Sequence, residues 1–271
     1  MDDRQKKQLI IVIVYLLIFA LVGFLVYRVF FYKTASCFDN VKNQNEEKID
    51  CGGSCVSCEI QTLQDVKIIW SKSFLIKDNI YDFAAQIENI NPNYGAKSLI
   101  YEFKAYDNSG NMIAGKKGST FILPNEKKYI VEPFIKSQKL ISKIELSLER
   151  PTWLELKEFE GSSFFVKEQQ INYPQDLSAV VEASGVIENK SSFDFNTVNV
   201  NVILLDSRDE AIGVNKTEIK TLLSGEERFF STRWFSKINE TIVSVDMETE
   251  TNVFANDNFM KRYGVLEKFK L

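Results

Sequence analysis

The longest uninterrupted apolar stretch of the chain runs from Leu9 to Tyr27 and contains no charged residue. As a helix rising about 1.5 Å per residue, it would cover roughly 28 Å, close to the hydrocarbon thickness of a bilayer. It has no polar face, and nothing else in the chain is apolar enough to bury it on every side in water. We therefore predict one transmembrane helix with its flank over residues 9–32, preceded by a short N-terminal segment, 1–8.

Beyond residue 60 the pattern changes to short runs rich in Val, Ile, Phe and Tyr, separated by Asn, Asp, Gly and Pro. Leu99, Tyr101 and Phe103 alternate with mostly polar neighbours, which is typical of a half-buried strand. The tetrapeptide 107–110, Asp-Asn-Ser-Gly, is a hairpin turn signal. The pattern predicts a mainly β body of antiparallel sheets. Its first strands are expected at 66–76, 80–90, 97–107, 111–123, 127–135 and 141–149.

The same order of motifs returns after about 100 residues. The matching segments are Ile87-Glu88-Asn89 with Ile187-Glu188-Asn189, Leu123-Pro124-Asn125-Glu126 with Leu223-Ser224-Gly225-Glu226, and Pro133-Phe134 with Arg233-Trp234. A period of this length is the size of a domain rather than of a solenoid repeat. We therefore predict two tandem β-sandwiches, over 61–150 and 151–255.

The join between the two predicted sandwiches is short. Pro151 marks it, because proline ends a strand, and 153–159 and 163–170 are expected to open the second sandwich. So short a join predicts that the two domains pack at a limited range of angles. In the C-terminal tail, 256–271, four aromatic or apolar residues at helical spacing predict a short amphipathic helix: Phe259, Tyr263, Leu266 and Phe269. This helix would cover an edge or end of the sandwich, or alternatively bind a partner.

All four cysteines of the chain lie in a neck between the apolar stretch and the body, over 33–60: Cys37, Cys51, Cys55 and Cys58. So short a segment cannot enclose a hydrophobic core, so covalent bonds or a metal must hold it together. Two disulfides are expected, with three pairings open. A zinc site of four cysteines is an alternative, although only one Cys-x-x-Cys spacing is present. A thioredoxin-type redox pair is another alternative, although no βαβ pattern surrounds it.

The neck also carries oxygen-bearing side chains between its first two cysteines, with candidate calcium ligands at Asp39, Asn43, Glu46 and Asp50. Calcium takes six to eight oxygen ligands, so such a cluster could hold the ion. The alternative is a polar, solvated loop, and no EF-hand spacing is present. We expect the solvated loop, with no bound metal or other cofactor.

Basic residues flank the apolar stretch unevenly, with Arg4, Lys6 and Lys7 before it and Arg28 and Lys33 after it. Positive charge favours the cytoplasmic side, so we expect a cytoplasmic N-terminus and an extracytoplasmic body. The cysteines agree, because disulfides need an oxidising compartment. A cleaved signal peptide would need small residues where 27–32 are bulky. A lipoprotein site at Cys37 would have a Leu-like residue where Thr34 stands.

Composition removes several classes of function. The chain has no histidine, which excludes Ser-His and Cys-His catalysis and imidazole metal ligands. Its net charge is −4, and the body is more acidic than the N-terminal segment, which argues against nucleic-acid binding. No phosphate-binding glycine loop or serine elbow is present. We therefore expect no enzyme.

Two further sets of residues have both structural and functional interpretations. Asp107 and Asp206 recur between the repeats and could form a catalytic acid pair, but each stands at a strand-to-turn junction, where Asp accepts local backbone hydrogen bonds. Trp70, Trp153 and Trp234 could form a carbohydrate platform, but aromatic residues on strands are mostly core or cross-strand partners. We expect the structural role for both sets.

The neck resembles a known module. Cys37-x-Asp39, followed by Asp50-Cys51-Gly52-Gly53-x-Cys55-x-x-Cys58, is similar to the Asp-Cys-Gly-Gly cysteine module of bacterial cell-surface and secreted proteins. The chain has Asn40-Val41 where those proteins commonly have Gly-Ile. The resemblance implies the outer face of a prokaryotic membrane and carries no activity with it.

The body resembles the FxLYD-type domain, a small immunoglobulin-like β-sandwich of prokaryotic extracytoplasmic proteins. The first repeat has Phe103-Lys104-Ala105-Tyr106-Asp107, with Ala where the family has Leu, and the second has the degraded form Val202-Ile203-Leu204-Leu205-Asp206. The family's Gly-x-Val-x-Asn strand appears as Gly185-Val186-Ile187-Glu188-Asn189. The resemblance implies two immunoglobulin-like sandwiches and no transferable chemistry.

Together these features predict a non-catalytic, membrane-anchored extracytoplasmic protein that presents two β-sandwiches to a partner. The expected partner is another envelope or membrane protein, with no role for nucleic acid. The alternative is a surface adhesin or a receptor for a glycan or other ligand.

Overall fold

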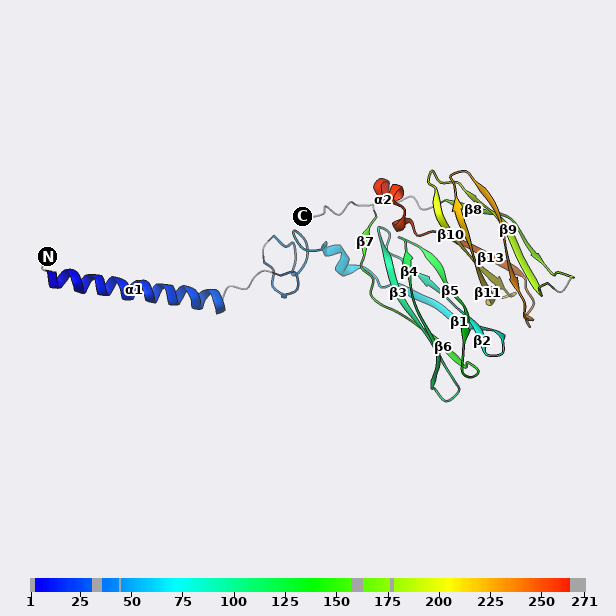
Figure 1. The fold of residues 1–271 in the computed structure, drawn as a ribbon, viewed down its shortest axis with the longest axis horizontal. Coiled ribbons are helices and arrows are strands. Elements are labelled where there is room, and N and C mark those ends of the chain that lie inside the picture. Colours follow the sequence, from blue (N-terminus) through cyan, green and yellow to red (C-terminus); the bar gives the residue numbers. More distant parts are fainter. Residues whose placement is uncertain (1–2, 31–35, 44, 157–162, 176–177, 264–271) are drawn as a thin grey trace. The chain divides into compact units, whose positions relative to one another are not determined.

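The computed structural model describes residues 3–30, 36–43, 45–156, 163–175 and 178–263 (Figure 1). By its contacts the chain divides into two compact units, Met1–Leu63 and Gln64–Leu271, which we describe separately.

The first unit begins with an apolar helix, α1, from Asp3 to Phe30. Its stretch from Lys7 to Arg28 is long and apolar enough to cross a membrane, and none of it is buried within the protein. A signal sequence near the N-terminus can meet the same criteria of length and apolar composition. The helix is therefore an anchor or a signal by these criteria. A short 3-10 helix, η1, follows the neck from Cys58 to Thr62.

The second unit is built from four antiparallel sheets. The strands of its first half are β1 (Lys67–Lys77), β2 (Ile80–Glu88), β3 (Tyr94–Tyr106), β4 (Met112–Ile122), β5 (Lys127–Lys136), β6 (Lys143–Leu148) and the short β7 (Leu154–Glu155). Those of its second half are β8 (Phe164–Asn172), β9 (Val181–Asn189), β10 (Phe195–Leu205), β11 (Ala211–Leu222), β12 (Glu227–Trp234) and β13 (Ser244–Glu250). The sheet orders are β1-β2-β5 and β4-β3-β6 in the first half, and β12-β9-β8 and β11-β10-β13 in the second. The six strands predicted for the first half are confirmed to within about three residues.

One expectation about the join differs from the structure. The segment 153–159 was expected to open the second half, but its strand β7 pairs with β3, Tyr94 lying opposite Glu155. These residues therefore extend the first half, and 157–162 lie outside the described residues. The predicted tail helix is present as α2, Asp257–Tyr263. Its Phe259 is fully buried in the core of the second half, 5.1 Å from Phe193 between ring centroids. Residues 264–271 lie outside the description.

Strand β2 is buried on both faces. The ring of Phe83 lies 5.7 Å, between centroids, from that of Phe103 in β3. The next residue, Ala84, belongs to a different buried cluster, with Ile203 of β10 and Val214 of β11. Because successive side chains of a strand point to opposite faces, the sheet β1-β2-β5 lies between the other sheet of its own half and the sheet β11-β10-β13.

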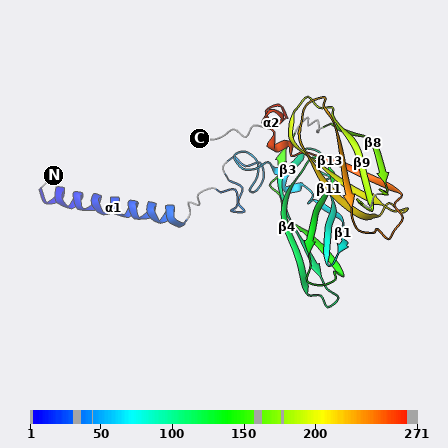
Figure 2. The same cartoon turned by 45° about the vertical axis from the view of Figure 1, so that its right-hand side comes forward.

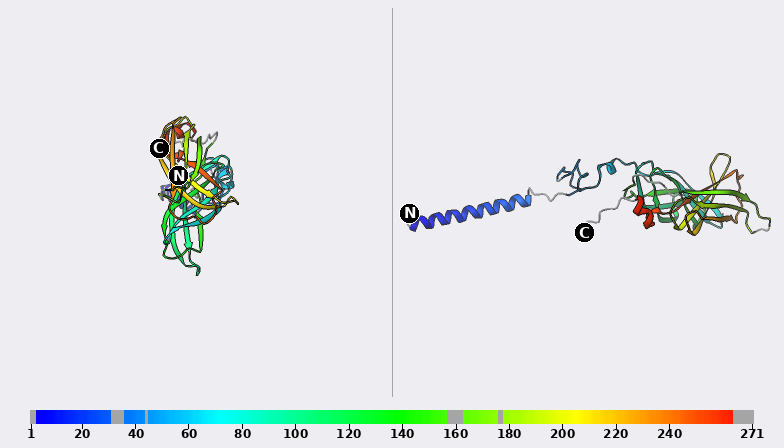
Figure 3. Two further views of the ribbon diagram at one scale, coloured as in Figure 1. Left: turned by 90° about the vertical axis from the view of Figure 1, so that its right-hand side faces the viewer. Right: turned by 90° about the horizontal axis from the view of Figure 1, so that it is seen from above.

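Strand β10 is likewise buried on both faces. Val202 and Leu204 share a core with Ile187 of β9, whereas Ile203 between them faces the first half. The four sheets thus stack in the order β4-β3-β6, β1-β2-β5, β11-β10-β13 and β12-β9-β8. The two halves lie next to each other in Figure 1 and Figure 2, and they overlap in projection in the end-on view of Figure 3. We call the contact between the two inner sheets the junction.

Polar groups of β5 and β13 fasten the junction. The backbone N–H of Tyr129 donates to both carboxylate oxygens of Glu248 at 3.0 Å, and the Tyr129 hydroxyl donates to Asp246 Oδ2 at 2.8 Å. The buried ammonium group of Lys128 pairs with the buried carboxylate of Glu250. We call Asp246, Glu248 and Glu250 the acidic face of β13, since they alternate along one side of that strand.

The repeat seen in the sequence also has matching hydrogen bonds. Asn89 is buried and its Nδ2 donates to the carbonyls of Tyr94 and Leu123, both at 2.7 Å. Asn189 is buried in the same way, and its Nδ2 donates to the carbonyls of Phe193 and Leu222 at 2.7 and 3.2 Å. Each asparagine thus satisfies two carbonyls that face the interior, where an unpaired carbonyl is costly. The two halves use one local design twice.

Candidate functional site

The four neck cysteines form two disulfides, Cys37–Cys55 and Cys51–Cys58. This confirms the expectation of two bridges and selects one of the three pairings left open by the sequence. All four sulfur atoms are used in these bonds, so in this state none is a thiolate that could ligate zinc or attack a disulfide.

The predicted calcium ligands lie together in the same loop. The carboxylate of Asp50 accepts hydrogen bonds from the backbone N–H groups of Asp39 and Asn40, both at 3.0 Å. Asp39 Oδ2 accepts from Asn43 Nδ2 at 2.8 Å, and the buried Glu46 accepts from the backbone N–H of Asn43 at 3.1 Å. These contacts explain how so small a loop closes, and calcium binding stays the untested alternative to the expected solvated loop.

The two recurring aspartates lie in separate halves and bind the turns that follow them. Asp107 Oδ1 accepts from the backbone N–H groups of Ser109 and Asn111 at 2.9 and 3.0 Å. The hydrogen bond from Asn111 is the main reason that the pKa of Asp107 is lowered to about 2. An acid that stays ionised at neutral pH cannot serve as a proton donor. Asp206 binds its own turn in the same manner, and its pKa is also lowered, by the backbone N–H of Glu210.

The three tryptophans do not share an exposed face. Trp153 and Trp234 are buried, and Trp234 Nε1 donates to the carbonyl of Val214 at 3.0 Å. Trp70 is partly buried, with its ring centroid 5.8 Å from that of Tyr129 at the junction. Their placement agrees with a packing role.

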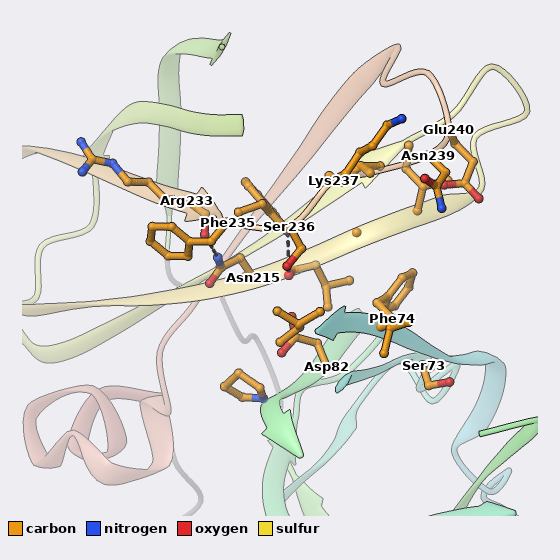
Figure 4. A pocket seen from close by; sticks show the side chains of 18 of the residues that line it. Ser73, Phe74, Asp82, Asn215, Arg233, Phe235, Ser236, Lys237, Asn239 and Glu240 are labelled. Carbon is orange, nitrogen blue, oxygen red and sulfur yellow. Dashed lines mark hydrogen bonds between the residues drawn. The ribbon is translucent and has the colours of Figure 1, made fainter. Parts of the chain in front are cut away.

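A cavity of about 240 Å³ opens at the junction (Figure 4). One wall comes from β1, β2 and β5 of the first half, and the other from β11 and the segment 233–240 of the second. Around it stand three large apolar side chains that remain exposed to solvent: Leu75 by 55%, Phe134 by 66% and Phe235 by 67%. Exposed apolar residues scattered singly need no explanation, whereas a group of them around one hollow is typical of an interaction site.

Asp82 is the buried acidic group of this cavity. Only 7% of the residue is exposed, and its Oδ1 accepts a hydrogen bond from the backbone N–H of Phe134 at 3.0 Å. Removal from water disfavours the charged carboxylate, so burial raises the pKa of Asp82 to about 6. Near neutral pH the site therefore holds an ionised carboxylate in surroundings that stabilise its charge poorly.

The backbone beside Asp82 is irregular. In the pairing of β2 with β5, Tyr81 lies opposite Ile135 but Phe83 lies opposite Glu132. One strand therefore places two residues where the other places one, which is a β-bulge. Phe134, in the bulge, has φ of 59°, a left-handed conformation that costs a bulky residue energy. The bulge turns the N–H of Phe134 toward Asp82, while the side chain of Phe134 lines the cavity and stays largely exposed.

The basic residues that line the cavity leave Asp82 without a cation. Arg233 directs its Nε at Glu182, 2.8 Å from Oε2. Lys237 extends away from Asp82 (Figure 4). Among the residues that the structure describes, no Lys or Arg forms an ion pair with Asp82.

This site was not predicted from the sequence. Asp82 was visible as the one charge inside the apolar run 80–85, and Pro133-Phe134 was already matched with Arg233-Trp234. What could not be read was that the two features face each other across β2 and β5. No protein-family model matches this chain, and no curated protein matches it at a significant level. Its function must therefore be argued from the structure itself.

Proposed function

We propose that this protein is a non-catalytic, membrane-anchored extracytoplasmic protein that presents a binding surface to a protein partner in the same envelope. In this proposal α1 is the anchor, with its N-terminus in the cytoplasm, and the disulfide-bonded neck leads to two immunoglobulin-like sandwiches of the FxLYD type. The bulky residues after the apolar stretch support an anchor over a cleaved signal. The two disulfides support an oxidising compartment.

The single observation that carries the binding role is the cavity with its exposed apolar rim at the junction. Leu75, Phe134 and Phe235 come from three separate segments and would be costly to leave in water without a use. The junction that carries them is held by the buried pair of Lys128 and Glu250 and by the bonds of Tyr129 to β13. A surface held in this way meets a partner with little loss of conformational freedom.

The absence of catalysis is part of the same proposal. The chain has no histidine, and its recurring acids Asp107 and Asp206 already bind their own turns. Asp82 lies alone, without a nucleophile or a base at hydrogen-bonding distance among the described residues. A lone buried carboxylate is better suited to recognition than to acid–base chemistry.

The proposal can be tested in intact cells with a photo-reactive phenylalanine analogue at position 235. The matched control carries it at 165, an exposed aromatic position on the outer strand β8. A discrete cross-linked protein from position 235, and much less from 165, is expected. Equal cross-linking at both positions, or none at 235, would contradict the binding role.

The location is tested separately. After mild reduction of intact cells, a membrane-impermeant maleimide should label the neck cysteines without permeabilisation. Labelling only after permeabilisation would place the neck in the cytoplasm and refute the topology.

The presence of a cavity with an exposed apolar rim also favours a second candidate function, that of a surface adhesin or a receptor for a glycan or other ligand. In that case the position-235 probe would capture a soluble ligand or a molecule of another cell instead of a membrane protein of the same cell. The identity of the adduct separates the two functions.

A further inference from the structure

We propose that the junction cavity is a binding site for an alkylammonium group, with the carboxylate of Asp82 as its counter-charge. The expected source is a lysine side chain of the partner. The choice of a partner's lysine rests on the function proposed above, whereas the binding of an ammonium group by Asp82 does not.

Asp82 is a buried acid whose charge is poorly compensated. A buried charge is costly unless it is paired, and within the described part of the chain Asp82 has one backbone N–H donor and no cation. An ammonium group in the cavity would supply the missing partner and form a charge-assisted hydrogen bond. The burial that raises the pKa of Asp82 would then be offset, because a nearby positive charge favours the ionised carboxylate.

In the second half of the molecule, the acid at the equivalent position is paired with a cation of its own half. In the repeat, Asp82 of β2 corresponds to Glu182 of β9, and the bulge residues of β5 correspond to Arg233-Trp234 of β12. Glu182 lies directly opposite Arg233 in the strand register and is paired with it. Where the second half supplies its own cation, the first half has Pro133 and a bulge, and leaves the acid open to a cation from outside.

The size and lining of the cavity also fit an alkylammonium group. A volume of about 240 Å³ is below the roughly 300 Å³ at which pockets for drug-sized ligands begin. It suits one long side chain or a small amine. Phe74 and Phe134 line the cavity and Phe235 stands at its rim. Such aromatic rings accommodate the apolar stem of a lysine and attract its charged end.

The test uses the full chain in lipid nanodiscs at pH 7.5, where Asp82 is ionised, and follows binding by NMR titration. The probe is Nα-acetyl-lysine N-methylamide, and its neutral counterpart is Nα-acetyl-norleucine N-methylamide. The variants are Asp82→Asn, which keeps the acceptor for the N–H of Phe134, and Asp78→Asn as the matched control. Asp78 is an exposed residue of the β1–β2 turn, and its substitution removes the same charge away from the cavity.

The lysine probe should bind the unmodified protein saturably, with shifts at the residues that line the cavity. Affinity should fall about tenfold or more for the norleucine probe and in Asp82→Asn, since a hydrogen bond to a charged group is lost in each case. Asp78→Asn should bind like the unmodified protein. Equal binding of the lysine and norleucine probes to the unmodified protein would overturn the proposal, and this comparison does not depend on any variant folding.

A third probe separates the sources of the ammonium group. Binding of n-butylammonium as tight as that of the lysine probe would support a free amine as ligand, while a clear preference for the lysine probe would support a partner's side chain. If none of the probes binds but position 235 still cross-links to a membrane protein, the ammonium site is refuted and the proposed function stands. If the probes bind but position 235 captures no partner, the ammonium site stands and the proposed function is refuted.

Discussion

The two halves of the body use equivalent strand pairs in different surroundings. Strands β9 and β12 belong to the outer sheet of the second half, where Glu182 and Arg233 form a partly exposed pair. Strands β2 and β5 belong to an inner sheet, where Asp82 is buried against the other half and no described residue supplies a cation. Equivalent positions on the two strand pairs therefore hold an ion pair where they face solvent, and an acid that lines a cavity where the other half covers them.

This difference follows from how the halves stack. The sheet β1-β2-β5 corresponds to β12-β9-β8, yet the first is an inner sheet and the second an outer one. The halves thus pack through sheets that are not equivalent in the repeat. Of each pair of equivalent sheets, one lies inside at the junction and the other lies outside. A duplicated domain can gain a new site in this way without new strands, because covering one face turns a polar surface position into a buried one.

The largest expected effect comes from the ion pair of the junction. Lys128→Met leaves Glu250 buried beside Glu248, and the remaining cation among the described residues is Lys216, 3.9 Å away. The variant should lower the free energy of unfolding by about 3 kcal/mol or more. Lys167→Met, which removes an exposed pair with Glu227 in the second half, should cost less than about 1 kcal/mol. Urea unfolding of the full chain in detergent, followed by tryptophan fluorescence, measures both.

The double variant Lys128→Met, Glu250→Met completes this test. Replacing a whole buried pair by apolar residues is often neutral, so the double variant should regain most of the lost stability. If Lys128→Met costs no more than Lys167→Met, the junction pair is not the fastening described here.

The next largest effect concerns a feature that the two halves share, the buried asparagine that binds two backbone carbonyls. Asn89→Ala and Asn189→Ala each leave buried carbonyls without a donor and should each cost about 2 kcal/mol. The same unfolding measurement applies. Costs that differ by more than about 1 kcal/mol would show that the two asparagines do not have equivalent roles.

The third effect is the pH dependence of the junction. Burial raises the pKa of Glu248 from 4.5 to about 8, so the folded state disfavours its charged form. Its contribution to stability is present below pH 4.5 and is lost as the pH rises from about 4.5 to 8. Glu248→Gln should therefore gain stability relative to the unmodified protein over that range, as measured by unfolding at a series of pH values. A difference that stays constant with pH would exclude this account of Glu248.

The smallest effect compares the two equivalent acids directly. The pKa of Asp82 is raised from 3.8 to about 6 by burial, so its stability contribution falls as the pH rises through that range. Asp82→Asn should leave the protein as stable as before or slightly more stable at pH 7.5. Glu182→Gln breaks a partly exposed pair and should destabilise it by less than about 1 kcal/mol. Residues kept at a cost to stability are typical of binding sites. If Asp82→Asn raises the free energy of unfolding and Glu182→Gln lowers it, Asp82 is such a residue.

Much of the fold could be predicted from the sequence because its signals are local. Alternation of period two located strands such as β3, the spacing of the cysteines predicted two disulfides, and helical spacing around Phe259 predicted α2. The choice among three disulfide pairings could not be made, since it depends on how the neck closes through Asp39 and Asp50.

How the two halves stack could not be predicted from local sequence patterns. A run such as 80–87 is apolar on both faces, but it does not say which partner covers each face. β7 was assigned to the wrong half for the same reason, because its partner β3 lies far away in the sequence. Predicting the cavity would have required both the strand pairing and the stacking of the sheets, since its walls come from residues near 75, 82, 134, 214 and 235.

The most direct test of the comparison between the halves is the pKa of Asp82, measured by carbon NMR on full-length protein in nanodiscs with ¹³C-labelled aspartate carboxyl groups. Asp82→Asn assigns the signal. We expect a pKa of about 6 for the unmodified protein and a lower value when Nα-acetyl-lysine N-methylamide is present at saturation. A pKa near 3.8 that the probe does not change would contradict the account, because burial would then not disfavour the charged form of Asp82.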